Sequence, residues 1–95
     1  MKTHMIMDNS TGVIFFTVKY DSTGFTKVLR VDPTKEMGSA DFIKALFSFR
    51  CEYVHFIRYV NDKLYLMDNK KRIRVLEWEN ERNRDQGLTQ KYWLD

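Results

Sequence analysis

The chain has 95 residues, of which 43% are hydrophobic and 15% aromatic, with one proline and four glycines. This length allows one domain with a single core, and the composition argues against a disordered protein. The net charge of +3 is too small to indicate nucleic-acid binding by itself, and the single cysteine, Cys51, excludes an internal disulfide and favours a reducing, cytoplasmic location.

The N-terminal residues 1–11 are predicted to form a loose arm. They end in a run of Asp, Asn, Ser and Thr before Gly12, which is typical of a turn, and they contain no continuous apolar segment. Neither a signal peptide nor a membrane-spanning segment is expected. We therefore predict one globular domain over residues 1–95 that does not interact with a membrane.

Residues 13–20 and 25–31 are predicted to form an antiparallel hairpin. Both segments are rich in β-branched and aromatic residues, and the sequence Asp-Ser-Thr-Gly between them is typical of a turn. This turn pairs Tyr20 with Phe25 and places Phe15 opposite Arg30 on the outer side of the sheet. The side predicted to face the core carries the alternate residues Ile14, Phe16, Val18 and Tyr20.

Residues 40–51 are predicted to form a helix. Ser39 is a good N-cap, and Asp41 in the first turn interacts favourably with the helix dipole. Apolar residues recur at helical spacing, namely Phe42, Ala45, Leu46 and Phe49. We predict that the helix lies across the sheet and directs Phe42, Leu46 and Phe49 inward.

Residues 53–78 are predicted to form three further antiparallel strands, separated by turns at residues 61–62 and 69–70. The predicted fold is therefore α+β, with an antiparallel sheet of about five strands in the order β-β-α-β-β-β and one helix on its aliphatic face. Residues 79–95 are predicted as a polar connection followed by an apolar tail, 88–95, which covers a sheet edge or docks a partner.

The two predicted turns bring arginines and aromatic side chains onto one face of this sheet. The first turn places Arg58 opposite Tyr65, and the second adds Arg74 beside Tyr65. The neighbouring row contains Phe56, Met67 and Arg72. Including the first hairpin and the tail, the predicted partner-binding residues are Phe15, Arg30, Phe56, Arg58, Tyr65, Met67, Arg72, Arg74, Tyr92 and Trp93.

Three hypotheses account for this Arg/aromatic surface. In the first, the arginines only solvate the exposed side of the sheet and stack on aromatic rings, for about 0.5–1 kcal/mol per pair. In the second, which we favour, the face binds a protein, because Tyr, Phe, Met and Arg are enriched at interfaces. In the third, it binds single-stranded nucleic acid, with Phe56 and Tyr65 stacking on bases and the arginines contacting phosphates. The sequence leaves open whether the protein is a monomer or a homodimer.

The sequence contains no motif for catalysis, phosphate binding or metal binding. Cys51 and His55 are four positions apart, but the predicted helix ends between them, which disfavours a nucleophile–base or metal pair. We therefore expect a non-catalytic protein without a metal or cofactor. In size and composition it looks like the small accessory proteins that viruses use as stoichiometric regulators or inhibitors of host machinery.

Overall fold

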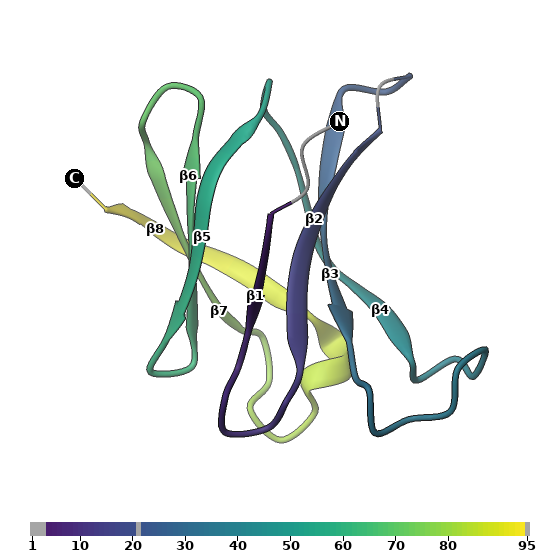
Figure 1. Cartoon of the computed structure of the whole chain (residues 1–95). Coiled ribbons are helices and arrows are strands. Elements are labelled where there is room, and N and C mark those ends of the chain that lie inside the picture. The colour runs from purple at the N-terminus through teal and green to yellow at the C-terminus, as the bar shows by residue number, and fades with distance from the viewer. Residues whose placement is uncertain (1–3, 21, 95) are drawn as a thin grey trace.

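A computed structural model describes residues 4–20 and 22–94 and shows an all-β protein (Figure 1). Sheet A contains, in spatial order, β1 (Met5–Met7), β2 (Ile14–Tyr20), β3 (Phe25–Val31) and β4 (Ile43–Arg50). Sheet B contains β5 (Val54–Val60), β6 (Lys63–Asp68), β7 (Ile73–Trp78) and β8 (Leu88–Leu94). Both sheets are antiparallel, and the described residues contain no α-helix, only a 3₁₀ turn, η1 (Arg84–Gln86). The predicted α+β fold with one five-stranded sheet is therefore wrong.

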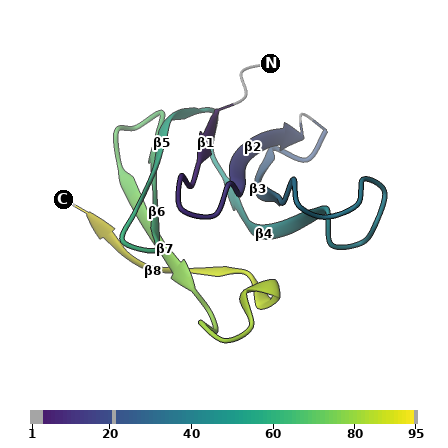
Figure 2. The same ribbon diagram turned by 60° about the horizontal axis from the view of Figure 1, so that its bottom comes forward.

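The two sheets enclose one hydrophobic core. Figure 2 shows β2, β3 and β4 on one side of the domain and β5 to β8 on the other, with β1 between β2 and β5. Both sheets contribute side chains to the core, which consists of Phe15, Val28, Leu46, Phe49, Val54, Ile57, Leu64, Leu66, Leu76, Trp78 and Leu88. No helix within the described residues is long and apolar enough to cross a membrane.

The predicted register of the first hairpin is confirmed, but its predicted orientation is wrong. Tyr20 pairs with Phe25 and Phe15 with Arg30, as expected. Phe15 is only 1% exposed, however, and lies in the core. The side of β2 that points away from the core carries Ile14, Phe16, Val18 and Tyr20. Because apolar residues occupy both sides of this strand, alternation alone did not identify the side that faces the core.

The residues predicted as a helix form a turn-rich loop and β4. Gly38 has a φ of 92°, and the Phe42 N–H donates to the Ser39 carbonyl at 3.2 Å, so Ser39 belongs to a turn and caps no helix. The loop is closed by a hydrogen bond of 3.0 Å from the Asp32 N–H to the Phe42 carbonyl. From Ile43 onward the chain pairs with β3.

A β-bulge explains why β4 resembles a helix in the sequence. The register between β3 and β4 shifts at Leu46, which has no partner of its own in β3. A bulge re-aims the side chains that follow it, and both Leu46 and Phe49 are buried although they are three positions apart. This spacing imitates the apolar stripe of a helix, whereas a regular strand would bury alternate residues.

The two terminal segments are strands. Residues 5–7 of the predicted arm form β1 and pair with β2, while residues 1–3 lie outside the described residues. Residues 88–94 of the predicted tail form β8, which pairs with β7 and covers its edge; Asp95 is not described. At the start of β8, Gly87 has a φ of 89°, and a Cβ there would lie 2.6 Å from the Leu46 carbonyl oxygen. β8 therefore begins against β4 (Figure 1).

Candidate functional site

The centre of the predicted binding surface lies on the β5–β6 hairpin, whose predicted register is confirmed. Both residues of the turn at 61–62 have a positive φ, 50° and 61°, as a type I′ turn requires. The turn places Arg58 opposite Tyr65 and Phe56 opposite Met67. These four side chains lie on the side of the sheet that points away from the core, because Ile57, Leu64 and Leu66, which alternate with them, are buried in the core.

The register between β6 and β7 differs from the prediction by one residue. The loop contains three residues instead of two, because Lys71 has a positive φ of 61° and its N–H donates to the Asp68 carbonyl at 3.0 Å. This geometry is a type I turn followed by a left-handed residue. Val75 therefore pairs with Tyr65, where Arg74 was predicted. A shift of one residue moves every side chain of β7 to the opposite face.

The four strands of sheet B together present one surface to solvent, which we call the β5–β8 outer face. β8 contributes to it because Tyr92 pairs with Val75 and Leu94 pairs with Ile73. The pairings define its members as Phe56, Arg58, Val60, Lys63, Tyr65, Met67, Ile73, Val75, Glu77, Thr89, Tyr92 and Leu94. The predicted site residues that the structure brings together on this face are Phe56, Arg58, Tyr65, Met67 and Tyr92.

The β5–β8 outer face has a covered centre and an exposed margin. Val75 is 0% exposed although it lies outside the core cluster, and Tyr65 and Tyr92 flank it in the same row. At the margin, Tyr92 and Leu94 are 43% and 45% exposed. The apolar side chains of this face are therefore most accessible at its margin.

The charged side chains of this face contact its aromatic rings. The Arg58 guanidinium lies 5.2 Å from the centroid of the Phe56 ring. The Lys63 ammonium lies 6.0 Å from the centroid of the Tyr92 ring and 3.6 Å from the Glu77 carboxylate. Tyr92 and Glu77 raise the pKa of Lys63, so its ammonium stays charged at neutral pH. The face is thus aromatic with charges of both signs.

Arg74 does not lie on this face. It is 7% exposed, and its guanidinium lies 4.5 Å from the ring centroids of both Phe49 and Trp93. Its Nη1 donates to Asp68 Oδ2 at 3.1 Å. The placement of Arg74 on the outer face is therefore wrong, and Trp93, which is 42% exposed, lies on the same side as Arg74. The extra residue in the β6–β7 loop turns Arg74 toward the core side, where Trp93 pairs with it.

Asp68 connects the β6–β7 loop to Arg74. Its carboxylate is 1% exposed in the side chain and accepts hydrogen bonds from the backbone N–H groups of Lys70 and Arg72 and from the Arg72 Nε. Burial alone would raise the pKa of Asp68, but these hydrogen bonds and the Arg72 charge hold the pKa below its usual value. Arg72 precedes β7, and its guanidinium also lies 4.7 Å from the Trp93 ring, so its placement on the outer face is wrong as well.

The remaining two predicted site residues belong to the core and its end. The Phe15 ring lies 4.6 Å from the Tyr59 ring and 6.0 Å from the Trp78 ring, centroid to centroid. Arg30 points to the same inward side and lies 3.8 Å from both Asp32 and Asp85. Their predicted position on an outer surface is wrong, because β2 and β3 direct the opposite side to solvent.

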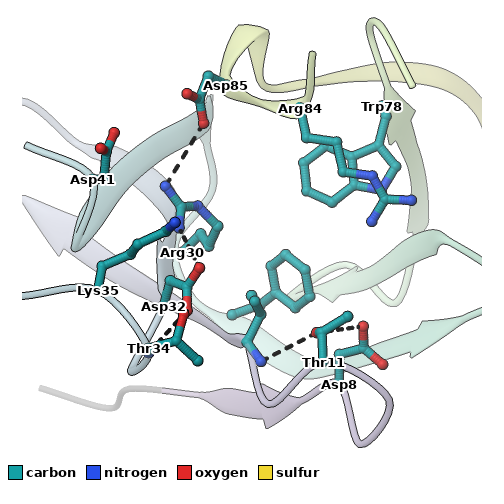
Figure 3. Close-up of a pocket in the computed structure, with 12 residues that line it drawn as sticks. Asp8, Thr11, Arg30, Asp32, Thr34, Lys35, Asp41, Trp78, Arg84 and Asp85 are labelled. Atoms are coloured by element: carbon teal, nitrogen blue, oxygen red, sulfur yellow. Dashed lines mark hydrogen bonds and ion pairs between the residues drawn. The ribbon is translucent and has the colours of Figure 1, made fainter. Parts of the chain in front are cut away.

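A pocket of about 450 Å³ opens at this end of the sandwich (Figure 3). Phe15 and Trp78 form its apolar wall, and loops around residues 8–13, 32–41 and 78–85 supply the polar lining. Because these loops are distant in sequence, the pocket could not be recognised from the sequence. The charged lining is mixed, with Arg30, Lys35 and Arg84 beside Asp8, Asp32, Asp41 and Asp85, so the charges by themselves favour neither an anion nor a cation.

Cys51 and His55 have ordinary surroundings. The Cys51 Sγ lies 3.6 Å from the Thr26 hydroxyl oxygen, and the His55 ring lies 5.5 Å from the Tyr53 ring. In residues 4–20 and 22–94, no group of three or more His, Cys, Asp or Glu side chains could hold a metal ion.

Comparisons with protein-family models, curated proteins and solved structures found no match.

Proposed function

We propose that this protein is a small non-catalytic binding protein, a stoichiometric regulator or inhibitor that contacts another protein through the β5–β8 outer face. The observation that supports this most is the gathering of Phe56, Arg58, Tyr65, Met67 and Tyr92 on one solvent-facing side. Phe, Tyr, Met and Arg are the residue types enriched at protein interfaces, and aromatic and Arg side chains supply most of the binding anchors.

The arrangement of this face suits a protein partner. Its side chains project from paired strands, so few degrees of freedom are lost when a partner orders them. The charges of Arg58, Lys63 and Glu77 accompany the apolar rows, and such charges steer association and select partners more than they add affinity. The aromatic residues would then contribute most of the binding free energy.

Single-stranded nucleic acid is the alternative ligand, because Phe56 and Tyr65 could stack on bases. The arginine contribution that this hypothesis requires is smaller than predicted. Arg72 and Arg74 both contact Asp68 and lie off the face, and Lys63 pairs with Glu77. Arg58 remains as the main candidate for a phosphate contact, which supports little counterion release.

An affinity pull-down from cells that produce the protein, with and without nuclease, separates these ligands. We expect a protein that stays bound after nuclease treatment. If nuclease releases all bound material, the ligand is nucleic acid and the proposal is wrong.

Two tyrosines of similar exposure on opposite sheets provide matched variants for the recovered partner. Tyr92 on the β5–β8 outer face is 43% exposed, and Tyr20 on sheet A is 42% exposed. We expect Tyr65→Ala to weaken binding by about 30-fold or more and Tyr92→Ala to weaken it measurably. Tyr20→Ala should change the dissociation constant by less than about twofold. Equal effects of Tyr92→Ala and Tyr20→Ala would place the binding site elsewhere.

A further inference from the structure

The outward side of sheet A is more apolar than the β5–β8 outer face. Two complete rows across its four strands contain only apolar side chains. One row consists of Met7, Ile14, Val31 and Ile43, and the next consists of Met5, Phe16, Leu29 and Ala45. Met5, Met7 and Ile43 are 65%, 51% and 49% exposed. We call these two rows, together with Val18, Tyr20, Phe25, Lys27, Ser48 and Arg50, the sheet A outer face.

The sequence of β2 indicates that both of its sides are covered. Residues 13–16 are Val-Ile-Phe-Phe, a continuous apolar run, whereas a half-solvated antiparallel strand alternates apolar and polar residues. The core covers the side of Phe15 and Thr17, which are 1% and 3% exposed. Among the described residues, no strand packs against the other side, which carries Ile14 and Phe16.

We propose that a second copy of this chain covers the sheet A outer face, so that two sheets A pack face to face around a two-fold axis. Interfaces between identical subunits are more apolar than other protein interfaces, which matches the difference between the two outer faces of this domain. Self-association through sheet A does not depend on the protein-binding role of the β5–β8 outer face.

The area of the face is sufficient for a specific contact. β1 has three residues, β2 and β3 have seven each, and β4 has eight. At about 3.4 Å per residue and about 4.8 Å between strands, they give a flat footprint of roughly 400 Å². Protruding side chains have a larger accessible area than the footprint, which brings each copy toward the about 800 Å² typical of a stable interface. Two packed sheets of this kind lie about 10 Å apart with strands within about 30° of each other.

The charges at the two ends of the sheet A outer face select the direction of the axis. At the end with Tyr20 and Phe25, Lys27 and Arg50 lie over these rings at 5.3 and 4.6 Å and form no ion pair among the described residues. At the other end the loops 8–12 and 32–42 carry four carboxylates and one lysine. Asp32 pairs with Arg30 and Asp41 with Lys44, so Asp8 and Glu36 are the carboxylates without an ion pair among the described residues. A two-fold axis in the sheet plane and perpendicular to the strands places each basic end over the acidic end of the other copy. An axis parallel to the strands would bring like charges together.

Sedimentation equilibrium over a wide concentration range tests this pair. We expect the wild type to form a species of twice the 11.5 kDa mass of one chain. Leu29→Glu, near the middle of the face, should raise the dimer dissociation constant by about 100-fold or more, because each copy then buries an unpaired carboxylate. Tyr53→Ala, at a position that is 45% exposed and belongs to neither outer face, is the control and should leave the dimer unchanged.

A second substitution and a reversal of charges distinguish loss of the dimer from loss of the fold. Ile43→Glu, at a half-exposed edge position, should also produce monomers, and circular dichroism reports whether each variant retains its sheets. Lys27→Glu with Arg50→Glu should weaken association about tenfold, and adding Asp8→Lys with Glu36→Lys should restore it. A wild type that stays monomeric at every concentration, or a dimer that persists in both Leu29→Glu and Ile43→Glu, would overturn the proposal.

Discussion

Replacement of Arg74 by alanine should destabilise the fold. Removal of one partner of a buried ion pair typically lowers the free energy of unfolding by about 3–5 kcal/mol. Asp68 keeps the Arg72 side chain and two backbone donors, which favours the lower limit of about 3 kcal/mol. The lost contacts with the Phe49 and Trp93 rings add about 0.5–1 kcal/mol each. We therefore expect a loss of about 4 kcal/mol, which lowers the Tm of a domain of this size by about 15 °C or more.

Urea denaturation followed by tryptophan fluorescence measures this loss. Arg58→Ala is the matched control, because Arg58 is exposed on the β5–β8 outer face and stacks on one ring only. Its free energy of unfolding should change by about 1 kcal/mol or less. Arg74→Lys keeps the charge but not the planar guanidinium, so its loss should lie between those of the two alanine variants. If Arg74→Ala is as stable as Arg58→Ala, then Arg74 faces solvent, and the pairing of β6 with β7 in which Val75 is opposite Tyr65 is incorrect.

Three further substitutions, two of them with a control variant, test the loops and the approach of the two sheets. Gly87→Ala should destabilise by at least about 2 kcal/mol in urea melts, because its Cβ would lie 2.6 Å from the Leu46 carbonyl oxygen. Gly12→Ala, with a similarly positive φ but open space around the Cβ, should lose only about 1 kcal/mol. The pKa of Asp68 is lower in the folded protein than the value of 3.8 that it has in the unfolded chain. The Asp68 carboxylate therefore stabilises the fold fully above about pH 4, and this contribution is lost as the pH falls through the folded pKa. Asp68→Asn should therefore flatten the fall in stability below about pH 4 in acid titrations. Lys71→Gly should raise the free energy of unfolding by about 0.5 kcal/mol, because Lys71 has a φ of 61° and glycine adopts this conformation without strain. Lys70→Gly, one position earlier, is the control and should not raise it.

The parts of the site that follow from a local turn could be predicted from the sequence. Asn and Asp at residues 61–62 tolerate positive φ, so the type I′ turn and the positions of Phe56, Arg58, Tyr65 and Met67 could be inferred from neighbouring residues alone. The β6–β7 loop could not, because lysine does not favour the left-handed conformation that Lys71 adopts. The Asp68 carboxylate supports that conformation by accepting two backbone hydrogen bonds across the loop.

The fold predicted from the sequence was wrong at two points for the same physical reason. At each of them the local sequence suits two structures, and tertiary contacts decide between them. The spacing of Leu46 and Phe49 suits a helix or a bulged strand, and pairing with β3 selects the strand. Phe15 and Phe16 are equally apolar, and only the position of sheet B makes Phe15 the core residue.

Methyl NMR of methionine-labelled protein, titrated with the protein recovered by pull-down, tests the proposed role of the β5–β8 outer face most directly. Met67 lies on this face, Met5 and Met7 lie on the sheet A outer face, and Met37 is 81% exposed in the loop between β3 and β4. We predict that the partner shifts or broadens the Met67 signal and leaves the Met37 signal unchanged. An unchanged Met67 signal with shifted Met5 and Met7 signals would show that the partner binds sheet A, which contradicts the proposed function.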